Sequence, residues 1–284
     1  MTRLVVFYDH PRYEEKRIIS EARDRGVEVE LVNTGRLILW LGDGAAVPDA
    51  DVYLQRSLSL YRSLTVTAFV EALGGRIVNS SKTQMLCGNK FLTTLMLYMH
   101  GVPVPRSVIV FDKHEALKAA SELGYPVVVK PVIGSWGRLV ARADTPESLE
   151  GIIEDRLMLG GGLYRVVYMQ EYVNKPDRDL RVFVVGDHVA TAIYRVNKSS
   201  WRTNTALGAV AEPARVDPEL EDVCLRAARA VGGGVLGVDV FEDPERGYLV
   251  NEVNANVDFR NTERVTGYNL AGDIVEYLLE LARR

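Results

Sequence analysis

The chain has 284 residues, of which 47% are hydrophobic and 25% are charged, so it can bury a substantial core and could form two or three small domains. Its net charge of −4, without any basic run interleaved with aromatic residues, argues against nucleic acid as a partner. No apolar run approaches the roughly 18 residues of a membrane helix, and the first residues carry no signal-peptide cleavage pattern, so we expect a cytoplasmic protein that does not bind membranes.

The first third of the chain predicts a small parallel α/β domain. Residues 3–33 read as a buried strand, an amphipathic helix that ends at Gly26, and a second strand; residues 50–80 continue this alternation. The GxGxxG motif that a Rossmann-type dinucleotide site needs after its first strand is missing. We therefore assign residues 1–88 to an N-terminal α/β domain that does not bind a dinucleotide.

The rest of the chain predicts two α+β subdomains. Two prolines within residues 102–112 mark a break, after which the pattern reads helix, strand, glycine-containing loop, strand and helix. From residue 166 onward, strands alternate with turns before two further helices. We assign residues 89–165 to a central subdomain and residues 166–284 to a C-terminal subdomain.

A lysine followed by a glycine-containing loop is the first candidate site. Lys130 ends an otherwise apolar strand, and a buried ammonium group needs an anionic partner, for which a phosphate would serve. The backbone N–H groups of the following loop could cover phosphates, although a plain β-hairpin turn would give the same sequence. The loop consists of Gly134, Ser135, Trp136, Gly137 and Arg138.

Charged and amide side chains recur on successive predicted strands of the C-terminal part. A single charged residue on a strand is usually solvated, but that explanation would have to be repeated for many positions here. Residues at i and i+2 on a strand share one face, which groups Asp179 with Arg181 and Glu252 with Asn254. The full set is Glu171, Asp179, Arg181, Arg195, Asn204, Asp239, Glu252 and Asn254.

The acidic members of this set predict a magnesium site. Asp239 and Glu252 would repel each other in a dry site unless a divalent cation lay between them, and carboxylate and amide oxygens suit Mg²⁺. Because Mg²⁺ takes few protein ligands and fills the rest with phosphate oxygens, the pattern predicts ATP as the second ligand. Matching positive charge would come from Lys90, Lys130, Arg181 and Arg195.

The order of these motifs resembles that of the ATP-grasp superfamily of carboxylate–amine ligases over essentially the whole chain. The resemblance is carried by Lys90 and by "VVVKP", "IGSWGR", "QEYV", "RDLRVFVVG", "RTN", "VDVFE" and "VNEVNANVDF". It is closest to the RimK-like enzymes, and closer still to LysX-type ligases, which attach 2-aminoadipate to a small amino-group carrier protein in lysine biosynthesis. The resemblance implies an α/β (α+β) ATP-grasp fold, in which two subdomains enclose ATP.

The resemblance also implies a role for each nucleotide-site residue. Lys90 and Lys130 would hold the α- and β-phosphates, and the loop from Gly134 to Arg138 would close over the triphosphate. Asp179 would lie near the ribose. The backbone of the hinge would read the adenine edge; this hinge consists of Glu171, Tyr172 and Val173.

The remaining roles concern the metal and the reacting groups. The resemblance implies that magnesium, as two ions, is held by Asp239, Glu252 and Asn254. It also implies that the γ-phosphate and the acceptor carboxylate are lined by Arg181, Arg195 and Asn204. The run "DFRN" (residues 258–261) stands where the family has Glu–Phe–Lys–Asn, which makes Arg260 a candidate contact for the amino-acid substrate, with Asp258 and Asn261 beside it.

The implied reaction activates the γ-carboxylate of the carrier's C-terminal glutamate as an acyl phosphate, which the amino group of 2-aminoadipate or glutamate then attacks. An acidic carrier would need cations at the mouth of the cleft. Arg56, Ser57 and Arg62 follow a predicted strand at the carboxyl end of a parallel sheet, where α/β proteins usually bind ligands. We expect the two arginines to steer the carrier; the alternative is an ordinary solvated loop.

Two other functions fit the same motifs. A RimK-like glutamate ligase acting on another protein or on a small cofactor would share the ATP site and differ in its acceptor. A non-catalytic nucleotide-binding regulator belongs to another class, but it would not need Asp239, Glu252 and Asn254 together. A homo-oligomer is compatible with every one of these functions.

Overall fold

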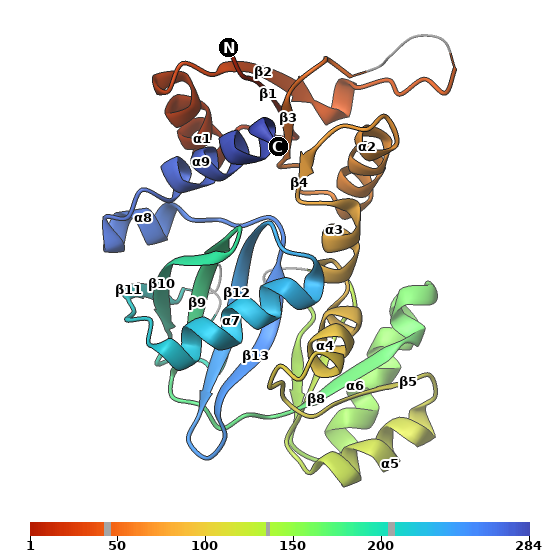
Figure 1. Cartoon of the computed structure of the whole chain (residues 1–284). Helices are drawn as coiled ribbons and strands as arrows, with labels where there is room; N and C mark the ends of the chain where they lie inside the picture. The colour runs from red at the N-terminus through yellow and green to blue at the C-terminus, as the bar shows by residue number, and fades with distance from the viewer. Residues whose placement is uncertain (43–46, 135–136, 204–207) are drawn as a thin grey trace.

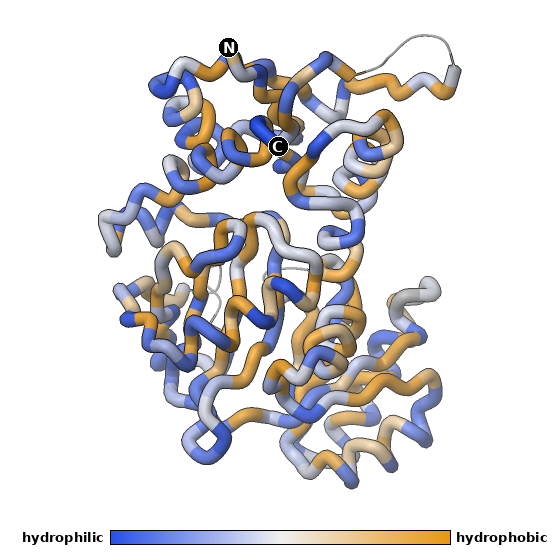
Figure 2. Tube along the Cα trace, viewed as in Figure 1, coloured by the Kyte–Doolittle hydropathy of each residue, from blue (hydrophilic) through white to orange (hydrophobic). Residues whose placement is uncertain are grey.

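The computed structural model describes residues 1–42, 47–134, 137–203 and 208–284, and these residues form three sheets with helices packed around them. Figure 1 shows the N-terminal sheet beside the C-terminal helix, the largest sheet below it, and the central subdomain at the far end. In Figure 2, hydrophobic stretches follow the strands, whereas the helices alternate between hydrophobic and hydrophilic residues, as expected of helices with one buried face. None of the helices in these ranges is long and apolar enough to cross a membrane.

The N-terminal part forms a four-stranded parallel sheet with the strand order β2-β1-β3-β4, which confirms the predicted parallel α/β arrangement. Its first helix buries Ile18, Ile19 and Ala22, as the amphipathic spacing predicted, and Ile18 and Ala22 join the core formed by the strands. The elements are β1 (Arg3–Tyr8), α1 (Tyr13–Asp24), β2 (Glu28–Asn33), the 3₁₀ helix η1 (Thr34–Arg36), β3 (Val52–Gln55), α2 (Leu60–Ala72), β4 (Ile77–Val78) and α3 (Ser81–Cys87).

The central part forms a four-stranded antiparallel sheet with the order β5-β8-β6-β7, covered by two helices, α5 and α6. Its last strand in sequence, β8, pairs with β5 and β6, so this sheet extends to Glu171 and beyond the boundary expected at residue 165. The elements are α4 (Lys90–Met99), β5 (Ser107–Val110), α5 (Lys113–Leu123), β6 (Val127–Lys130), β7 (Ala141–Ala143), α6 (Pro146–Leu159), the 3₁₀ helix η2 (Gly162–Arg165) and β8 (Val167–Glu171).

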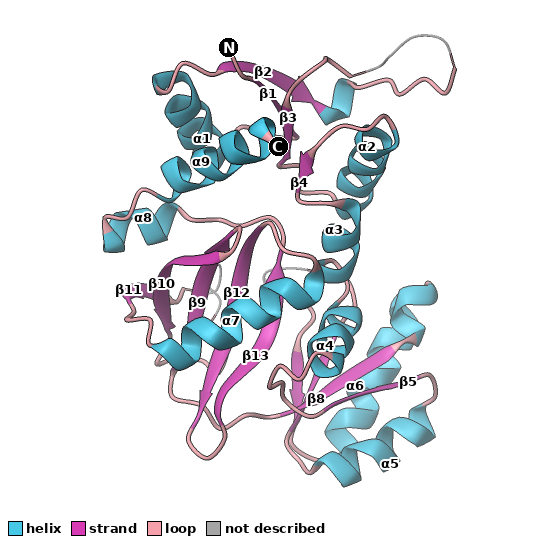
Figure 3. Ribbon diagram, in the orientation of Figure 1, coloured by secondary structure: helices cyan, strands magenta, loops and turns pink. Residues whose placement is uncertain are grey.

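The C-terminal part forms a five-stranded antiparallel sheet with the order β11-β10-β9-β12-β13, and α7 lies across one of its faces (Figure 3). Its last helix, α9, returns to the N-terminal domain and packs against α1 and β3. The elements are β9 (Arg178–Val185), β10 (His188–Val196), β11 (Val210–Pro213), α7 (Pro218–Val231), β12 (Val235–Asp243), β13 (Gly247–Asn254), α8 (Arg260–Thr266) and α9 (Leu270–Arg283).

The alternation of side chains along β9 explains how one sheet serves two purposes. Leu180, Val182 and Val184 point into the apolar core under α7. On the opposite face, Phe183 and Val185 join the core shared with the N-terminal domain. Asp179 and Arg181, earlier on the same face of the strand, lie outside that core. The face of the sheet that is turned away from α7 therefore has two parts. One part packs in the core shared with the N-terminal domain, and the other carries polar side chains.

Candidate functional site

Two adjoining cavities of about 470 and 490 Å³ lie along the polar half of this sheet face. The first is lined only by residues between Lys90 and Glu252, and thus by the central and C-terminal parts, as far as the described residues show. The second also includes Arg12, Glu14 and Leu58 of the N-terminal domain. Both cavities share one wall, which consists of Gly134, Arg138, Arg195, Asp239 and Glu252.

A chain of buried ion pairs runs through this shared wall. Arg195 donates to both oxygens of Asp179, at 2.7 and 2.8 Å, and its Nη2 lies 3.2 Å from Asp239 Oδ2. Arg181 binds the same Asp239 through Nε and through Nη2, the latter at 2.9 Å from Oδ2. Asp179, Arg195 and Asp239 are each at most 5% exposed, so water screens these charges only weakly.

Strand register places these charges next to one another. Asp239 on β12 lies opposite Arg181 on β9 and opposite Glu252 on β13. Room for the Arg181 side chain comes from Gly237, because a Cβ atom there would stand 3.2 Å from Arg181 Cδ. Asp179 and Arg181, predicted to share one face of a strand, thus form their ion pairs with residues of neighbouring strands.

The arginines decide the protonation state of the buried carboxylate. Burial alone would raise the pKa of Asp239, but Arg181 and Arg195 hold this pKa below its ordinary value. Burial likewise works to lower the pKa of Arg195, yet Asp179 and Asp239 raise it above the usual range. Asp239 and Arg195 are therefore both ionised at neutral pH.

Two lysines stand at the other side of the first cavity. Lys90 Nζ lies 2.6 Å from Glu252 Oε1, and Lys130 Nζ donates to Gln170 Oε1 at 2.5 Å and to Asn251 Oδ1 at 2.7 Å. Burial lowers the pKa of Lys130 to about 7, with Glu252 opposing this shift and Lys90 adding to it. Lys130 is thus a buried amine whose contacts are neutral amide oxygens and whose charge an anion would stabilise.

The proposed metal ligands lie on neighbouring positions of one hairpin. Asp239 pairs with Glu252, and Asn254 pairs with Gly237 two residues further along the same strands. The Asn254 Nδ2 atom is buried without a hydrogen-bond partner in the described part of the chain. No group of three or more His, Cys, Asp or Glu residues within the described ranges could hold a metal ion. These donors are too few for a closed cage, and they fit an ion such as Mg²⁺ that completes its shell with phosphate oxygens.

The predicted hinge residues line the first cavity, but the Glu171 side chain forms its contacts elsewhere. Its Oε1 accepts from the backbone N–H of Arg106 and from Arg246 on the turn between β12 and β13. The N–H groups of Glu171 and Tyr172 donate to the carbonyl oxygens of Arg106 and Pro126, each of which precedes a strand of the central sheet. Tyr172 and Val173 line the cavity directly.

The structure describes only part of the predicted phosphate loop. Gly134 and Gly137 line the first cavity with positive φ values of 139° and 67°, which glycine adopts without strain. Arg138 lies between both cavities. Three predicted residues lie outside the described residues: Ser135, Trp136 and Asn204.

The expectation that Arg56 steers a partner at the cleft mouth is wrong. This side chain is buried, with its Nε 2.9 Å from Glu15 and its Nη2 2.9 Å from Val257 O. Ser57 is also buried, and Arg62 is exposed but paired with Asp9 at 2.7 Å. Neither Ser57 nor Arg62 lines the two cavities formed by the described residues. The sequence does not show that Arg56 is buried, because its partners, Glu15 and Val257, lie on other parts of the chain.

The structure brings Asp258, Arg260 and Asn261 together at the second cavity. It adds residues that the sequence reading missed: Arg12, Glu14, Gln170, Lys175, Thr203, Asn251 and Asn256. Gln170 and Asn251 each precede a predicted site residue on a buried strand, which was a usable signal. Glu14 falls within the predicted amphipathic helix and Arg12 just before it, and nothing in the local sequence distinguishes them.

Comparison with known proteins gives consistent matches. The RimK-like ATP-grasp domain matches residues 87–278, and the LysX preATP-grasp domain matches residues 4–86. The alpha-aminoadipate–LysW ligase LysX of Saccharolobus solfataricus is 42% identical over 96% of this chain and 100% of its own. The glutamate–LysW ligase ArgX of Sulfurisphaera tokodaii is 34% identical over 98% of this chain and 98% of its own. A RimK domain ATP-grasp protein from Sphaerobacter thermophilus superposes with a TM-score of 0.82 at 28% identity, covering 98% of this chain and 99% of that one.

We predict that Arg195→Met lowers the free energy of unfolding by about 3–5 kcal/mol, because it leaves Asp179 and Asp239 buried with less compensating charge. Arg226→Met is the matched control, since Arg226 is partly exposed and pairs with Asp222 on its own helix and with the carbonyl oxygen of Gly101, so its loss should cost at most about 1 kcal/mol. Chemical denaturation at neutral pH measures both. A loss for Arg195→Met as small as that of the control would contradict the importance of the buried chain.

Proposed function

Because the chain belongs to the RimK-like ATP-grasp family of carboxylate–amine ligases, we propose that it joins 2-aminoadipate to a small acidic carrier protein in lysine biosynthesis. Membership of this family confirms the fold and the enzyme class that the sequence predicted. The observation that supports the finer proposal is the wall shared by the two cavities. ATP would occupy the first cavity and the reacting carboxylate and amine the second, so that the γ-phosphate meets the carboxylate at Arg195, Asp239 and Glu252.

The first chemical step would form an acyl phosphate. An oxygen of the carrier's C-terminal glutamate γ-carboxylate attacks the γ-phosphorus, and the bond from this phosphorus to the ADP oxygen breaks. Lys90 and Lys130 would bind the α- and β-phosphates, while Arg181 and Arg195 would offset charge on the transferred phosphoryl group and the carboxylate. Asn204 is proposed to act with these arginines.

The second step would form the amide. The amine nitrogen of the amino acid attacks the acyl carbon, inorganic phosphate leaves, and the nitrogen gives up a proton. No covalent bond to the protein is needed, so the chain acts by positioning, by charge stabilisation and by excluding water. Arg260 at the second cavity is the proposed contact for a substrate carboxylate, with Asp258 and Asn261 beside it.

Magnesium would be held by Asp239, Glu252 and Asn254, and it would neutralise charge on the phosphates. The register that places Asp239 opposite Glu252, with Asn254 two residues further along β13 on the same face, supports this assignment. We propose that two magnesium ions bind at this site. The adenine would lie against the hinge formed by Glu171, Tyr172 and Val173, with Asp179 near the ribose.

The proposed amine is 2-aminoadipate rather than glutamate. The LysX relative is 42% identical and the ArgX relative 34% identical, which favours the aminoadipate branch. The two amino acids differ by one methylene, which a pocket distinguishes by only about 1–3 kcal/mol. We therefore expect glutamate to react as a slower second substrate.

We predict that the carrier gains the mass of one 2-aminoadipate residue when it is incubated with the protein, ATP and Mg²⁺, and that Glu252→Gln slows this ligation at least about tenfold. Intact-mass spectrometry of the carrier measures the product. Glu245→Gln, at an exposed position on the turn between β12 and β13, is the control and should ligate normally. A carrier that stays unmodified while glutamate is added to another acceptor would support the RimK-like alternative, and nucleotide binding without any turnover would support a regulator.

We predict a pH dependence of ATP binding that depends on Lys130. Below its pKa of about 7 the ammonium is already charged, whereas at higher pH the phosphates must first restore its proton. Affinity should fall by up to about tenfold per pH unit between roughly pH 7.5 and 9, with proton uptake measurable by calorimetry in buffers of different ionisation enthalpy. Lys130→Arg, which stays charged, should remove the dependence. An affinity that does not change over this interval would contradict the role given to Lys130.

A further inference from the structure

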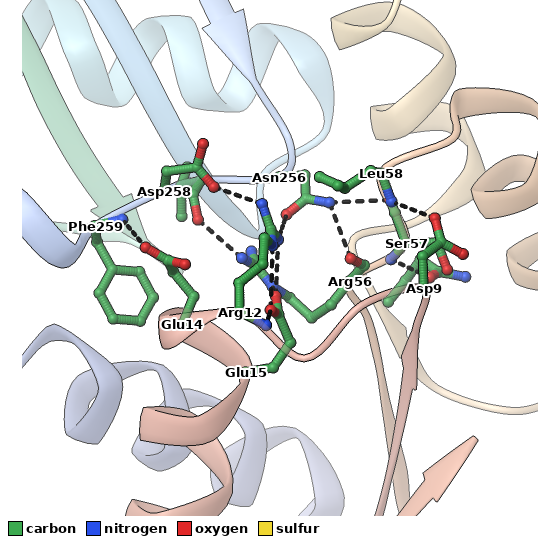
Figure 4. Close-up of polar contacts among 12 residues, drawn as sticks. Asp9, Arg12, Glu14, Glu15, Arg56, Ser57, Leu58, Asn256, Asp258 and Phe259 are labelled. Carbon is green, nitrogen blue, oxygen red and sulfur yellow. Dashed lines mark hydrogen bonds and ion pairs between the residues drawn. The ribbon is translucent and has the colours of Figure 1, made fainter. Parts of the chain in front are cut away.

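The N-terminal domain holds the segment Asn256–Arg260, which follows β13 directly and forms part of the second cavity. Figure 4 shows side chains from α1, from the turn before it and from the end of β3 converging on this segment. The first cavity has no lining residue from the N-terminal domain among the residues described. We therefore expect the N-terminal domain to influence the second cavity, where the amine and the acceptor carboxylate would bind.

Glu14 makes the most direct of these contacts. Its Oε1 accepts hydrogen bonds from the backbone N–H groups of Phe259 and Arg260, at 3.0 and 3.1 Å (Figure 4). Glu14 is only 4% exposed, and no ion pair joins it to a lysine or arginine of the described residues. A buried carboxylate is costly unless its hydrogen bonds stabilise it, so two backbone donors at one oxygen fix this part of the chain firmly.

The neighbouring Glu15 supports the same segment through two arginines. It is 1% exposed and accepts from Arg12 Nη2 at 2.7 Å and from Arg56 Nε at 2.9 Å. Burial alone would raise the pKa of Glu15, but Arg56 and Arg12 hold this pKa below its usual value. Arg56 in turn donates to Val257 O at 2.9 Å, and Arg12 to Asp258 Oδ1 at 2.6 Å.

Asn256 completes the contacts from the other direction. Its Nδ2 donates to the carbonyl oxygens of Arg56 and Ser57, at 3.2 and 3.0 Å, and its Oδ1 accepts from Arg12 at 3.2 Å. Each residue of the segment Asn256–Arg260 is thus bonded to the N-terminal domain. We call Arg12, Glu14, Glu15 and Arg56 the N-terminal clamp.

We propose that Glu14 is a positioning residue for the amino-acid substrate, and that it acts by fixing the backbone from which Arg260 reaches the second cavity. The proposal rests on the proposed function only in naming the amino acid as the ligand of this cavity. Arg260 itself lies over the Tyr13 ring, with its guanidinium carbon 5.7 Å from the ring centroid. Two features of α1 therefore set its place: the Glu14 carboxylate through the backbone, and the Tyr13 ring through the side chain.

The test compares Glu14→Ala with Glu14→Gln in the full-length protein. Glu14→Ala removes the acceptor for both backbone N–H groups, and should raise the KM for the amino acid at least about tenfold while the Kd for ATP changes less than about twofold. Glu14→Gln keeps a carbonyl oxygen at the same reach, and should restore most of the wild-type KM. Hydrogen exchange at the amides of Phe259 and Arg260 should accelerate in the alanine variant and return toward wild type in the glutamine variant.

Arg17→Met is the matched control, because Arg17 also joins α1 to the C-terminal helices, through Glu263 and Asn269, without contacting the clamped segment. It should leave both constants unchanged. If Glu14→Ala does not fold, Arg12→Gln takes its place, since Arg12 is 21% exposed at its side chain and loses its bonds to Asp258.

The possible results separate clearly. Unchanged amino-acid KM in a folded Glu14→Ala, an equal rise in the Kd for ATP, or no recovery in Glu14→Gln would overturn the positioning role. Failure of the wild-type protein to ligate any amino acid would instead overturn the proposed function. The exchange measurement needs no substrate, so it tests the clamp in either case.

Discussion

The Asp239 carboxylate, held between Arg181 and Arg195 on one face of the C-terminal sheet, is the contact on which the rest of the site depends. A buried carboxylate without partners would become neutral, and a neutral acid would be a poor ligand for a cation. The two arginines keep Asp239 ionised, and Asp179 anchors Arg195 from the other side. The same charges that stabilise each other in the protein are those that a phosphate and a cation would engage.

The fold uses a single sheet face for both this site and the core between domains. Along β9, the polar pair at residues 179 and 181 is followed on the same face by Phe183 and Val185, which pack under the N-terminal domain. The strand therefore fixes the distance between the chemistry and the domain interface. This is how contacts made by α1 would set the geometry of the second cavity.

Much of this arrangement could be predicted from the sequence, because strand alternation and residue spacing are local. The grouping of Asp179 with Arg181 and of Glu252 with Asn254 followed from the two-residue period alone, and the resemblance supplied the ATP-grasp fold. Arg56 was misjudged because its partners, Glu15 and Val257, are 41 and 201 residues away in the chain. The sequence pattern of an amphipathic helix does not indicate that its first charged residues, Glu14 and Glu15, are buried. The N-terminal clamp could therefore not be predicted from the sequence.

The central claim is that Lys90 and Lys130 leave their partners within the protein and bind the phosphates of the nucleotide instead. The most direct measurement is a crystal structure of the protein with Mg²⁺ and ADP. In this structure Lys90 lies 2.6 Å from Glu252; we predict that this pair separates in the complex, with Lys90 and Lys130 bonded to phosphate oxygens and Glu252 turned toward the cation. A complex in which ADP occupies the first cavity while Lys90 remains on Glu252 and Lys130 on Gln170 and Asn251 would contradict the account.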